Sequence, residues 1–329
     1  MTQSPTRLLV LYTGGTIGMQ QSAAGLMPAS GFETRLRERQ AETGEALPDW
    51  IFREFVPPLD SANMQPANWL QMAATIRAAV DHDGCNAVLV LHGTDTLAYS
   101  AAALSFLLLE LPAPVLLTGS MLPAAAPGSD AWDNLFGAMR ALQEHRVEGV
   151  CLFFNGALLH GARVSKLRSD DFDAFAEAPR KRQGPRADRR LPMSYRSAWQ
   201  PRGVAVLPLY PGVAAAQLTA LADSGVQALL LECYGSGTGP ADDPAFVAAL
   251  REAHARGLVL GAISQCPGGH VEFGVYAAGS GLRDAGLVSG GGMTREAALG
   301  KLFALLAAGL DQADVEYWFG HDLCGEMAG

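Results

Sequence analysis

The sequence predicts a doubly wound, mainly parallel α/β fold with a larger N-terminal domain and a smaller, Rossmann-like C-terminal domain. Three observations support this prediction. Short apolar, β-branched runs alternate with longer helical patterns through the 329 residues, and most of these runs are continuously apolar, as in strands buried on both faces. Residues 179–203 interrupt the alternation. With 49% hydrophobic residues, a chain of this length can bury a large core, which excludes a disordered protein.

The apolar runs predict strands, and the segments between them predict helices. Strands are expected at residues 8–12, 87–91, 114–118, 149–154, 204–209, 228–232 and 258–264. Helices are expected at residues 66–82, 97–110, 130–144, 214–222, 244–256 and 294–308. In the first of these helices Trp69, Met72 and Ile76 fall on one face, and Pro66 suits its first turn. Repetition of strand, loop and helix is the pattern of a doubly wound sheet.

Residues 181–203 are expected to form a solvated linker between an N-terminal catalytic domain, residues 1–180, and a C-terminal domain, residues 204–329. The segment is basic. Its lysine and arginine residues, with Arg180 at the edge, are Lys181, Arg182, Arg186, Arg189, Arg190, Arg196 and Arg202. A basic arm that binds nucleic acid or another anion is the alternative, but only Tyr195 and Trp199 offer aromatic rings for stacking on bases.

Composition and charge favour a reduced, cytosolic protein. The net charge of −9 argues against nucleic acid as a partner, because non-specific phosphate binding needs clustered Lys and Arg. No apolar run reaches the ~18 residues of a membrane span, and residues 8–12 are too short a run for the core of a signal peptide. The five cysteines are widely spaced without a CxxC pair, which argues against a disulfide framework or a zinc site.

The candidate functional residues follow the predicted strands. In open α/β sheets, ligands bind beyond the carboxyl ends of the strands. The segments found there are residues 13–18 (TGGTIG), 92–96 (HGTDT), 119–121 (GSM) and, further along, 163–166 (RVSK). Small residues, hydroxyls, one carboxylate and one amine therefore converge on one edge. A glycine-rich turn without a catalytic role is the alternative for the first loop, and a helix cap at Asp95 or Thr96 is the alternative for the second.

These residue types suit amide hydrolysis through a hydroxyl nucleophile. A threonine hydroxyl is a weak nucleophile at its own pKa and needs a base, which a lysine oriented by a carboxylate can supply. Backbone N–H groups in tight glycine turns can stabilise the oxyanion of a tetrahedral intermediate. The chain contains neither an HExxH nor a GxSxG motif. The sequence therefore favours a site with a threonine nucleophile and a lysine base over sites built on an HExxH or a GxSxG motif.

Two longer motifs identify a family. Residues 12–19 (YTGGTIGM) and 91–99 (LHGTDTLAY) resemble the two signatures of the bacterial-type L-asparaginase family, more closely of its cytoplasmic (type I) branch. Shorter similarities lie at residues 59–64, 118–120, 172–175 and 293–294. The resemblance covers most of the chain apart from the linker. It implies the two-domain asparaginase-like fold, hydrolysis of L-asparagine to L-aspartate and ammonia, no cofactor or metal, and a cytoplasmic location.

The resemblance also implies a role for each candidate residue. By match of motif, Thr16 is the nucleophile that forms a β-aspartyl ester. Thr94, Asp95 and Lys166 form a second cluster that relays protons and places the attacking group or water, and which threonine attacks first stays open. The residues expected to bind the substrate are Gly15, Asp60, Ser61, Gly93, Thr94, Asp95 and Ser120.

Within this set the resemblance separates several tasks. Asp60 and Ser61 match positions that hold the α-amino and α-carboxylate groups of the substrate, and Asp95 shares the ammonium. Ser120 lies beside the amide that is cleaved. The alternatives are an Asx turn at Asp60 and Ser61, and a surface position for Lys166. His92, in the second signature, is expected to be a structural hydrogen-bonding residue beneath its loop rather than a general base.

Three positions depart from the family's pattern. Many relatives carry a lid tyrosine that contacts the nucleophile, where this chain has Leu26, and Tyr12 or Tyr276 is a candidate substitute. Gly292 stands where relatives usually have an acidic residue before Met-Thr, so a contact there is lost. Glu232 stands where some cytoplasmic members have an effector-binding arginine. Because a carboxylate repels the carboxylate of the effector, we expect no allosteric response to asparagine.

Asparaginase activity is the leading hypothesis, and two alternatives remain. A catalytically impaired asparagine sensor, suggested by Leu26 and Gly292, predicts saturable binding without ammonia release. An amidotransferase-type subunit that releases ammonia shares this fold but usually carries an added N-terminal domain, whereas the first signature here begins at Thr13. Pairing of subunits completes the sites of this family, so a homodimer or a homotetramer is expected.

Overall fold

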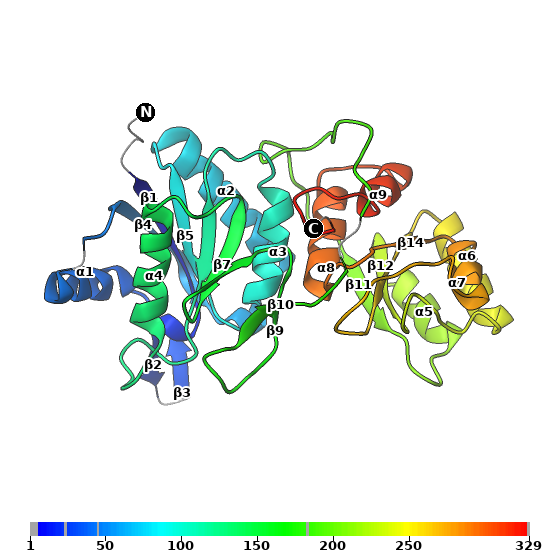
Figure 1. Cartoon of the computed structure of the whole chain (residues 1–329), viewed down its shortest axis with the longest axis horizontal. Helices are drawn as coiled ribbons and strands as arrows, with labels where there is room; N and C mark the ends of the chain where they lie inside the picture. The colour runs from blue at the N-terminus through cyan, green and yellow to red at the C-terminus, as the bar shows by residue number, and fades with distance from the viewer. Residues whose placement is uncertain (1–5, 23–24, 45, 182–183, 328–329) are drawn as a thin grey trace. The chain divides into compact units, whose positions relative to one another are not determined.

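The computed structural model describes residues 6–22, 25–44, 46–181 and 184–327. They form two compact units, Met1–Glu177 and Ala178–Gly329. Each unit has its own sheet and its own hydrophobic core (Figure 1). The predicted fold class, a mainly parallel α/β structure with a smaller C-terminal part, is therefore confirmed.

The first unit is built on a six-stranded sheet with the order β4-β1-β5-β6-β7-β8. Its strands are β1 (Arg7–Gly14), β4 (Asp49–Leu59), β5 (Ala87–Leu91), β6 (Val115–Thr118), β7 (Val150–Phe154) and β8 (Ala157–His160). Neighbouring strands pair in parallel except β8, which runs antiparallel to β7. Every residue of β5, β6 and β7 is buried, as expected for strands covered on both faces. The carboxyl ends of β1, β5 and β6 lie side by side.

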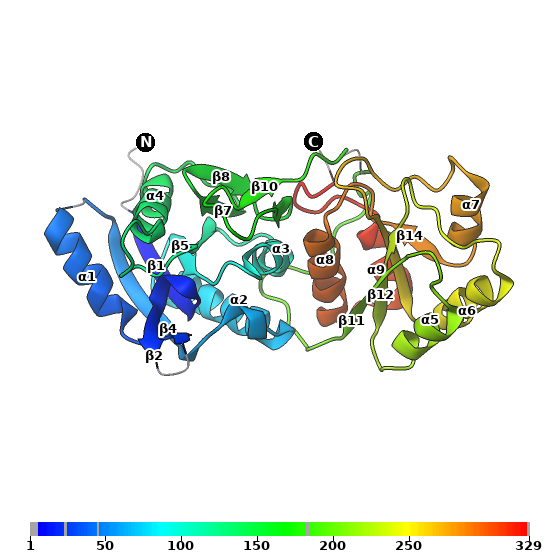
Figure 2. The ribbon, with the colours of Figure 1, turned by 90° about the horizontal axis from the view of Figure 1, so that it is seen from below.

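Helices cover this sheet in pairs. They are α1 (Phe32–Thr43), α2 (Pro66–His82), α3 (Leu97–Leu107) and α4 (Ala131–Gln143). Helices α1 and α4 cover one face, and α2 and α3 cover the other (Figures 1 and 2). Phe32 of α1 and Leu135 of α4 accordingly belong to one core cluster with Val10 and Leu89 of the sheet. The two hydrophobic faces of the sheet are thus each buried by a helix pair.

Short elements follow the strands at the edge where their carboxyl ends meet. They are the 3₁₀ turns η1 (Thr16–Gly18) and η2 (Ser61–Asn63), the hairpin of β2 (Met19–Ser22) and β3 (Gly25–Pro28), and the antiparallel pair β9 (Val164–Lys166) and β10 (Phe175–Glu177). Among the predicted catalytic residues, Thr16 and Lys166 lie in these elements, and Thr94 and Asp95 lie in the loop after β5. The sheet therefore serves as the support, and the segments beyond its strands carry the residues predicted to be catalytic.

The second unit contains a four-stranded parallel sheet with the order β11-β12-β13-β14. Its elements are β11 (Val204–Pro208), α5 (Ala215–Ala222), β12 (Ala228–Cys233), α6 (Pro244–Ala255), β13 (Val259–Ser264), α7 (Ala277–Arg283), β14 (Leu287–Ser289), α8 (Arg295–Ala307) and α9 (Gln312–Phe319). Helices α5, α6 and α7 cover one face, and α8 and α9 cover the other (Figure 2). In the described part of the chain, no helix has the length and apolarity to span a bilayer.

The apolar pattern in the sequence did not predict some elements or their exact ends, for identifiable reasons. Helix α1 buries only Phe32 and Leu36, so its amphipathic signal is weak. Strand β4 lies at the sheet edge and contains Pro57 and Pro58, which in a sequence argue against a strand. The helix expected at residues 97–110 ends earlier, at Leu107, before Glu110 takes a left-handed φ of 65°.

The basic segment before β11 belongs to the second unit and packs within it. Met193 and Tyr195 are buried. The guanidinium of Arg189 lies 3.9 Å from the centre of the Tyr317 ring, in a cation–π contact. One basic side chain of this segment, Arg189, is therefore used in packing, and the assignment of residues 181–203 as a linker between domains stays a prediction.

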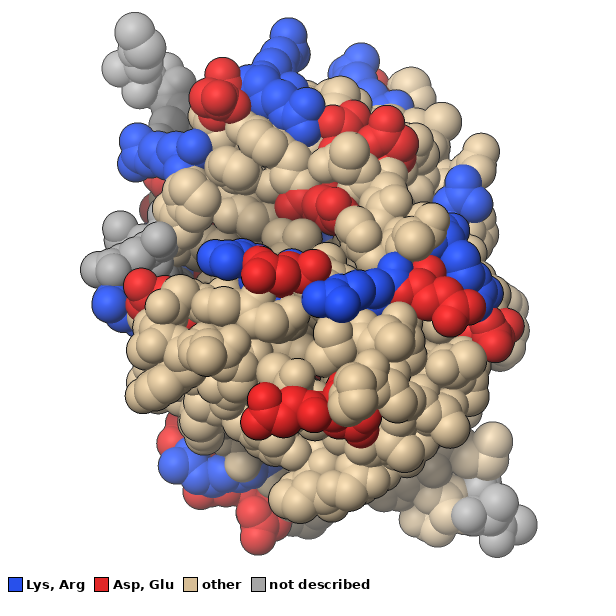
Figure 3. Space-filling model, turned by 90° about the vertical axis from the view of Figure 1, so that its right-hand side faces the viewer, with Lys and Arg blue, Asp and Glu red and all other residues tan. Residues whose placement is uncertain are grey.

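Charges of opposite sign are mixed on the surface of the second unit. On the face that Figure 3 shows, Lys and Arg side chains lie among Asp and Glu side chains with uncharged surface between them. Exposed ion pairs of this unit include Arg256–Asp223 at 2.8 Å and Arg283–Asp284 at 3.0 Å. Such exposed pairs contribute at most about 1 kcal/mol each to stability.

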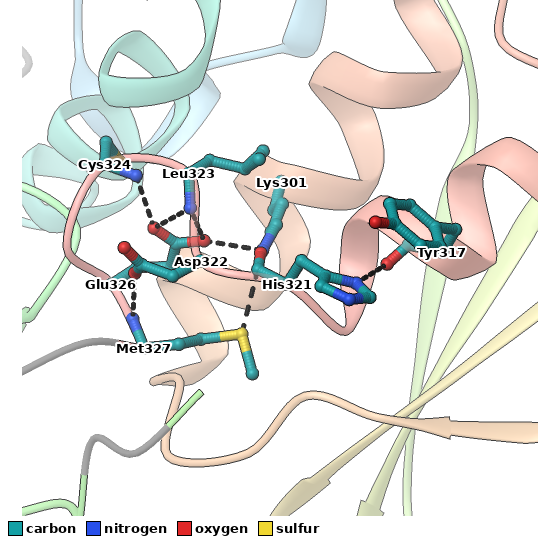
Figure 4. A network of polar contacts seen from close by, with 8 residues as sticks. All are labelled: Lys301, Tyr317, His321, Asp322, Leu323, Cys324, Glu326 and Met327. Atoms are coloured by element: carbon teal, nitrogen blue, oxygen red, sulfur yellow. Dashed lines mark hydrogen bonds and ion pairs between the residues drawn. The ribbon is translucent and has the colours of Figure 1, made fainter. Parts of the chain in front are cut away.

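A buried ion pair holds the C-terminal loop on α8 (Figure 4). Lys301 and Glu326 are fully buried, and Lys301 Nζ lies 2.5 Å from Glu326 Oε1 and 2.5 Å from the carbonyl oxygen of His321. The Glu326 carboxylate also accepts the N–H groups of Leu323 and Cys324. Burial by itself would raise the pKa of Glu326, but the Lys301 charge and these hydrogen bonds outweigh burial and lower it.

Replacing Glu326 with Gln is expected to destabilise the protein by about 3–5 kcal/mol, because Lys301 is left buried without a counter-charge. The double variant K301M/E326M is expected to cost less than E326Q, since it removes both charges. Urea unfolding at neutral pH measures the free energy of unfolding of both variants.

Because the folded-state pKa of Glu326 is lowered, the ion pair contributes its full stabilisation at neutral pH. This contribution is lost as the pH falls below 4.5 through the folded-state pKa. An E326Q variant as stable as the parent would contradict the role assigned to the pair.

Candidate active site

Three turns touch at the carboxyl edge of the first sheet. The N–H of Gly15 donates to the carbonyl oxygen of Leu59 at 2.9 Å. Gly15 has a φ of 84°, and a Cβ placed on it would come closer than 3.0 Å to the backbone of Gly93. A Cβ on Gly93 would in turn lie 2.5 Å from Ser61 Oγ. Only glycine allows this close approach, which brings the loops after β1, β4 and β5 into contact.

Thr16 begins the 3₁₀ turn directly after β1. The carbonyl oxygen of Gly15 accepts the N–H of Gly18 at 3.1 Å, and the carbonyl oxygen of Thr16 accepts the N–H of Met19. These bonds reverse the chain, so that Thr16 is half-buried at the start of the turn and the β2–β3 hairpin follows it. The proposed nucleophile thus adjoins the glycine that touches the second loop.

Lys166 joins the second loop from a distant part of the sequence. Its Nζ lies 3.0 Å from Thr94 Oγ1 and 2.7 Å from Asp95 Oδ1. The side chain of Lys166 is 19% exposed, that of Asp95 is 64% exposed, and Thr94 is 6% exposed. The alternative of a surface position for Lys166 is therefore wrong. A hydroxyl, an ammonium and a carboxylate form one hydrogen-bonded group, as proton transfer to and from a hydroxyl requires.

The η2 turn places Asp60 and Ser61 against the second loop. Asp60 Oδ1 accepts the N–H of Ala62 at 3.1 Å, so the Asx turn considered from the sequence is present. Ser61 is buried, and its carbonyl oxygen accepts Thr96 Oγ1–H at 2.8 Å. Thr96 is the N-cap residue of α3 but its side chain makes no capping bond. The helix-cap alternative for the second loop is therefore wrong, because both of its candidate side chains are engaged elsewhere.

The third loop is held by two side chains that the sequence did not single out. Ser120 is buried, and its Oγ donates to the carbonyl oxygen of Leu122 at 2.6 Å. Asp130 accepts the N–H of Met121, and Asn134 Nδ2 donates to the carbonyl oxygen of Gly119 at 3.1 Å. Asp130 was expected only as the start of a helix. Residues 119–130 form a long connection between β6 and α4, so no spacing in the sequence indicated this contact.

His92 lies at the base of the second loop in a chain of hydrogen bonds. Its Nδ1 lies 2.7 Å from the carbonyl oxygen of Gly93, and its Nε2 lies 2.8 Å from Ser100 Oγ. A carbonyl only accepts, so Nδ1 carries the proton and Nε2 accepts from Ser100, which accepts the indole N–H of Trp69 at 3.0 Å. Complete burial lowers the pKa of His92 from 6.5 to about 4. The predicted structural role of His92 is confirmed.

The two candidate substitutes for the lid tyrosine lie in different surroundings. Leu26 itself lies in β3 and is 50% exposed. Tyr12 is fully buried, its hydroxyl donates to the carbonyl oxygen of Ala29 at 3.2 Å, and burial raises its pKa to about 12. Tyr276 is exposed and belongs to the second unit. Tyr12 therefore serves as a hydrogen-bond donor to the backbone rather than as a proton carrier.

The other two departures from the family's pattern, Gly292 and Glu232, lie in the second unit and have structural explanations. A Cβ on Gly292 would come closer than 3.0 Å to the carbonyl oxygen of Lys181, so this position requires glycine. Glu232 is buried and forms a two-pronged ion pair with Arg295. The charge of Glu232 is thus neutralised, which removes the electrostatic reason for expecting no effector response. The absence of allostery stays a prediction.

The sequence argues against both a metal site and a disulfide. Within the described ranges, no group of three His, Cys, Asp or Glu side chains is arranged to hold a metal ion. The five cysteines, all in those ranges, carry free thiols.

Burial of neutral His92 predicts a stability loss in mild acid. Its folded-state pKa of about 4 lies below the ordinary 6.5, so the unfolded chain takes up a proton first and stability falls as the pH drops from 6.5 to 4. His92→Asn keeps a donor near Nδ1 but removes this titration, and should flatten the loss of thermal stability across that range. His145→Asn, at an exposed histidine, is the matched control. Equal pH dependence in the parent and H92N would refute this assignment.

The chain matches two family models and several known proteins. The models are the N-terminal asparaginase domain, over residues 7–196, and the glutaminase/asparaginase C-terminal domain, over residues 203–319. L-asparaginase 1 of Escherichia coli (strain K12) is 38% identical over 97% of each chain. The crystal structure of L-asparaginase I from Vibrio cholerae is 34% identical, with a TM-score of 0.85 over 99% of this chain and 100% of that chain.

A more distant relative is a glutamyl-tRNA(Gln) amidotransferase subunit of Metallosphaera sedula. It is 31% identical over 98% of this chain and 77% of its own length. Both family models together span nearly the whole sequence, and the similarity to L-asparaginase 1 runs end to end. This chain belongs to the asparaginase family of amidohydrolases.

Proposed function

We propose that this chain hydrolyses L-asparagine to L-aspartate and ammonia through a β-aspartyl ester on Thr16. The observation that carries the proposal is the hydrogen-bonded group of Lys166, Thr94 and Asp95, with Nζ at 3.0 Å and 2.7 Å from its two partners, beside the turn that holds Thr16. The similarity to proteins named L-asparaginase supports the choice of substrate.

The first half-reaction forms the ester. Thr16 Oγ1 attacks the side-chain amide carbon of asparagine, and its proton passes to the leaving nitrogen, so that ammonia departs as the C–N bond breaks. Backbone N–H groups of the turns that meet at Gly15 and Gly93, other than the Gly15 N–H that already donates to Leu59, stabilise the oxyanion of the tetrahedral intermediate. Preorganised donors of this kind do not have to rearrange as charge develops.

The second half-reaction cleaves the ester with water. Water adds to the ester carbon, gives a proton to the Thr94–Lys166 group, and the threonine leaves with a proton returned to its oxygen. The balance is one water consumed, one aspartate released and both threonine hydroxyls restored. In its neutral amine form Lys166 accepts this proton through the Thr94 hydroxyl, whose oxygen lies 3.0 Å from Nζ, and returns it to the leaving threonine oxygen.

Substrate orientation is assigned to the loop that follows β4 and to the second loop. Asp60 and Asp95 supply carboxylates for the α-ammonium, and Ser61 supplies polar contacts for the α-carboxylate. Asp60 Oδ1 is used in the Asx turn, so binding relies on the rest of that carboxylate. Ser120 fixes the third loop through its hydroxyl, and we propose that its backbone borders the scissile amide.

The proposed assembly is a homodimer or a homotetramer, and the proposed location is the cytoplasm. Both follow from membership in the family, and the free thiols are compatible with a reducing compartment. Light scattering coupled to size-exclusion chromatography should give at least twice the 34.6 kDa chain mass. A single monomeric peak would contradict the assembly.

Ammonia release from L-asparagine and L-glutamine tests the proposed activity. Thr16→Ala and Thr94→Val are each expected to lower kcat by at least about 10²-fold, because each loses a hydroxyl that takes part in proton or acyl transfer. Thr16→Ser and Thr94→Ser keep the hydroxyl and are the matched controls, expected to retain most of the activity.

The same assay separates the competing functions. Saturable binding of asparagine by the parent without ammonia release would favour the sensor alternative. Ammonia release that depends on an added tRNA-amidation partner would favour the amidotransferase alternative. Turnover of asparagine by the isolated chain, lost in T16A and T94V, is the outcome that the proposal predicts.

A further inference from the structure

The two ends of the β2–β3 hairpin are each held by one side-chain donor, the half-buried Arg35 and the buried Tyr12. Gly18 immediately precedes the hairpin, and its carbonyl oxygen accepts Arg35 Nη2–H at 3.1 Å. Ala29 immediately follows the hairpin, and its carbonyl oxygen accepts the Tyr12 hydroxyl at 3.2 Å. The Gly18 bond also acts on Thr16, since these two residues are the ends of the same 3₁₀ turn.

Both donors belong to one packed layer between the sheet and α1. The Tyr12 ring stacks on Phe32 with centroids 5.2 Å apart, and the Arg35 guanidinium lies 4.9 Å from the Phe32 centroid. A Cβ on Gly18 would overlap the Tyr12 hydroxyl, so this hydroxyl lies directly against the turn. The layer therefore leaves the turn little freedom to shift toward α1.

A third donor reaches the turn through the same aromatic layer. Phe32 stacks on Trp132 at 5.9 Å, and Trp132 Nε1 donates to the carbonyl oxygen of Ala124 at 3.1 Å. The N–H of Ala124 donates in turn to the carbonyl oxygen of Ile17 at 3.2 Å. Two successive carbonyl groups after Thr16 are thus fixed, one by Ala124 and one by Arg35.

Arg35 provides the only one of these donors that carries a formal charge. A charge-assisted hydrogen bond is stronger than a neutral one, and a guanidinium over an aromatic face is held in orientation. Burial keeps the Tyr12 hydroxyl protonated through the neutral range, since its pKa is about 12. The layer therefore keeps the same donors over the working pH range.

We propose that Arg35 is a positioning residue for the reaction: it fixes the carbonyl group of Gly18 and thereby the place of the Thr16 hydroxyl, while Tyr12 fixes the far end of the hairpin. The proposal rests on the proposed function, in which Thr16 is the nucleophile. A nucleophile displaced by about 1 Å loses roughly 10²-fold in rate. The groups that Arg35 contacts, the Gly18 carbonyl and the Phe32 ring, lie outside the loops that bind the substrate's α-groups. The loss should therefore fall on kcat and leave KM nearly unchanged.

The test compares Arg35→Met with Arg37→Met and Arg35→Lys. Arg37 lies on the same helix, is exposed, and pairs with Glu33, so R37M controls for loss of an α1 arginine. We expect R35M to lower kcat for L-asparagine by about 10–100-fold with KM within about twofold of the parent. R35K keeps a charged donor and should recover most of the rate, and R37M should match the parent.

Chemical rescue and hydrogen exchange keep the test decisive. Arg35 lines a cavity of about 230 Å³ with Arg39 and Trp132. Millimolar ethylguanidinium should therefore reach the space left by the side chain in R35A and raise the kcat of that variant, while ethylurea should not.

Amide hydrogen exchange at Ile17, Gly18 and Met19 should be faster in R35M than in R37M. This readout needs no activity, so an inactive parent would overturn the proposed function without hiding the result. Parental kcat in R35M, a loss confined to KM, or unchanged exchange would overturn the proposal.

Discussion

The site depends on close contact between the backbones of neighbouring loops. Gly15 and Gly93 leave no room for a Cβ between the first two loops, and Gly93 is equally close to Ser61. Parallel pairing of β1 with β4 and β5 brings these loops to one edge, but only the missing side chains let them meet. The proposed oxyanion donors, both threonines and the residues that hold the substrate all follow from that contact.

Buried polar chains then fix each loop from below. The neutral His92 tautomer supports the second loop, Asp130 and Asn134 support the third, and Arg35 with Tyr12 supports the first. Each of these groups bonds a backbone atom. The proposed catalytic side chains Thr94 and Lys166 are thereby left to bond one another.

The sequence could predict the parallel strands, because continuous apolar runs are the direct result of burial on both faces. It could also predict Thr16, Thr94 and Lys166 as candidates, since two long signatures and the segment after the fourth predicted strand carry them. It could not predict α1, whose charged surface hides two buried residues, nor the supporting contacts of Asp130 and Arg35. Those contacts join residues whose separation in the chain carries no periodic signal. Charge compensation of Glu232 by Arg295 was invisible for the same reason.

The central claim is that Thr16 carries the acyl group. Rapid acid quenching during turnover of L-asparagine, followed by proteolysis and mass spectrometry of the peptides, tests it directly, with T94V used to slow deacylation. The account predicts an aspartyl ester on Thr16 in the peptide that contains the first glycine turn. An ester on Thr94 in the parent, or turnover by T16A at the parental rate, would contradict it.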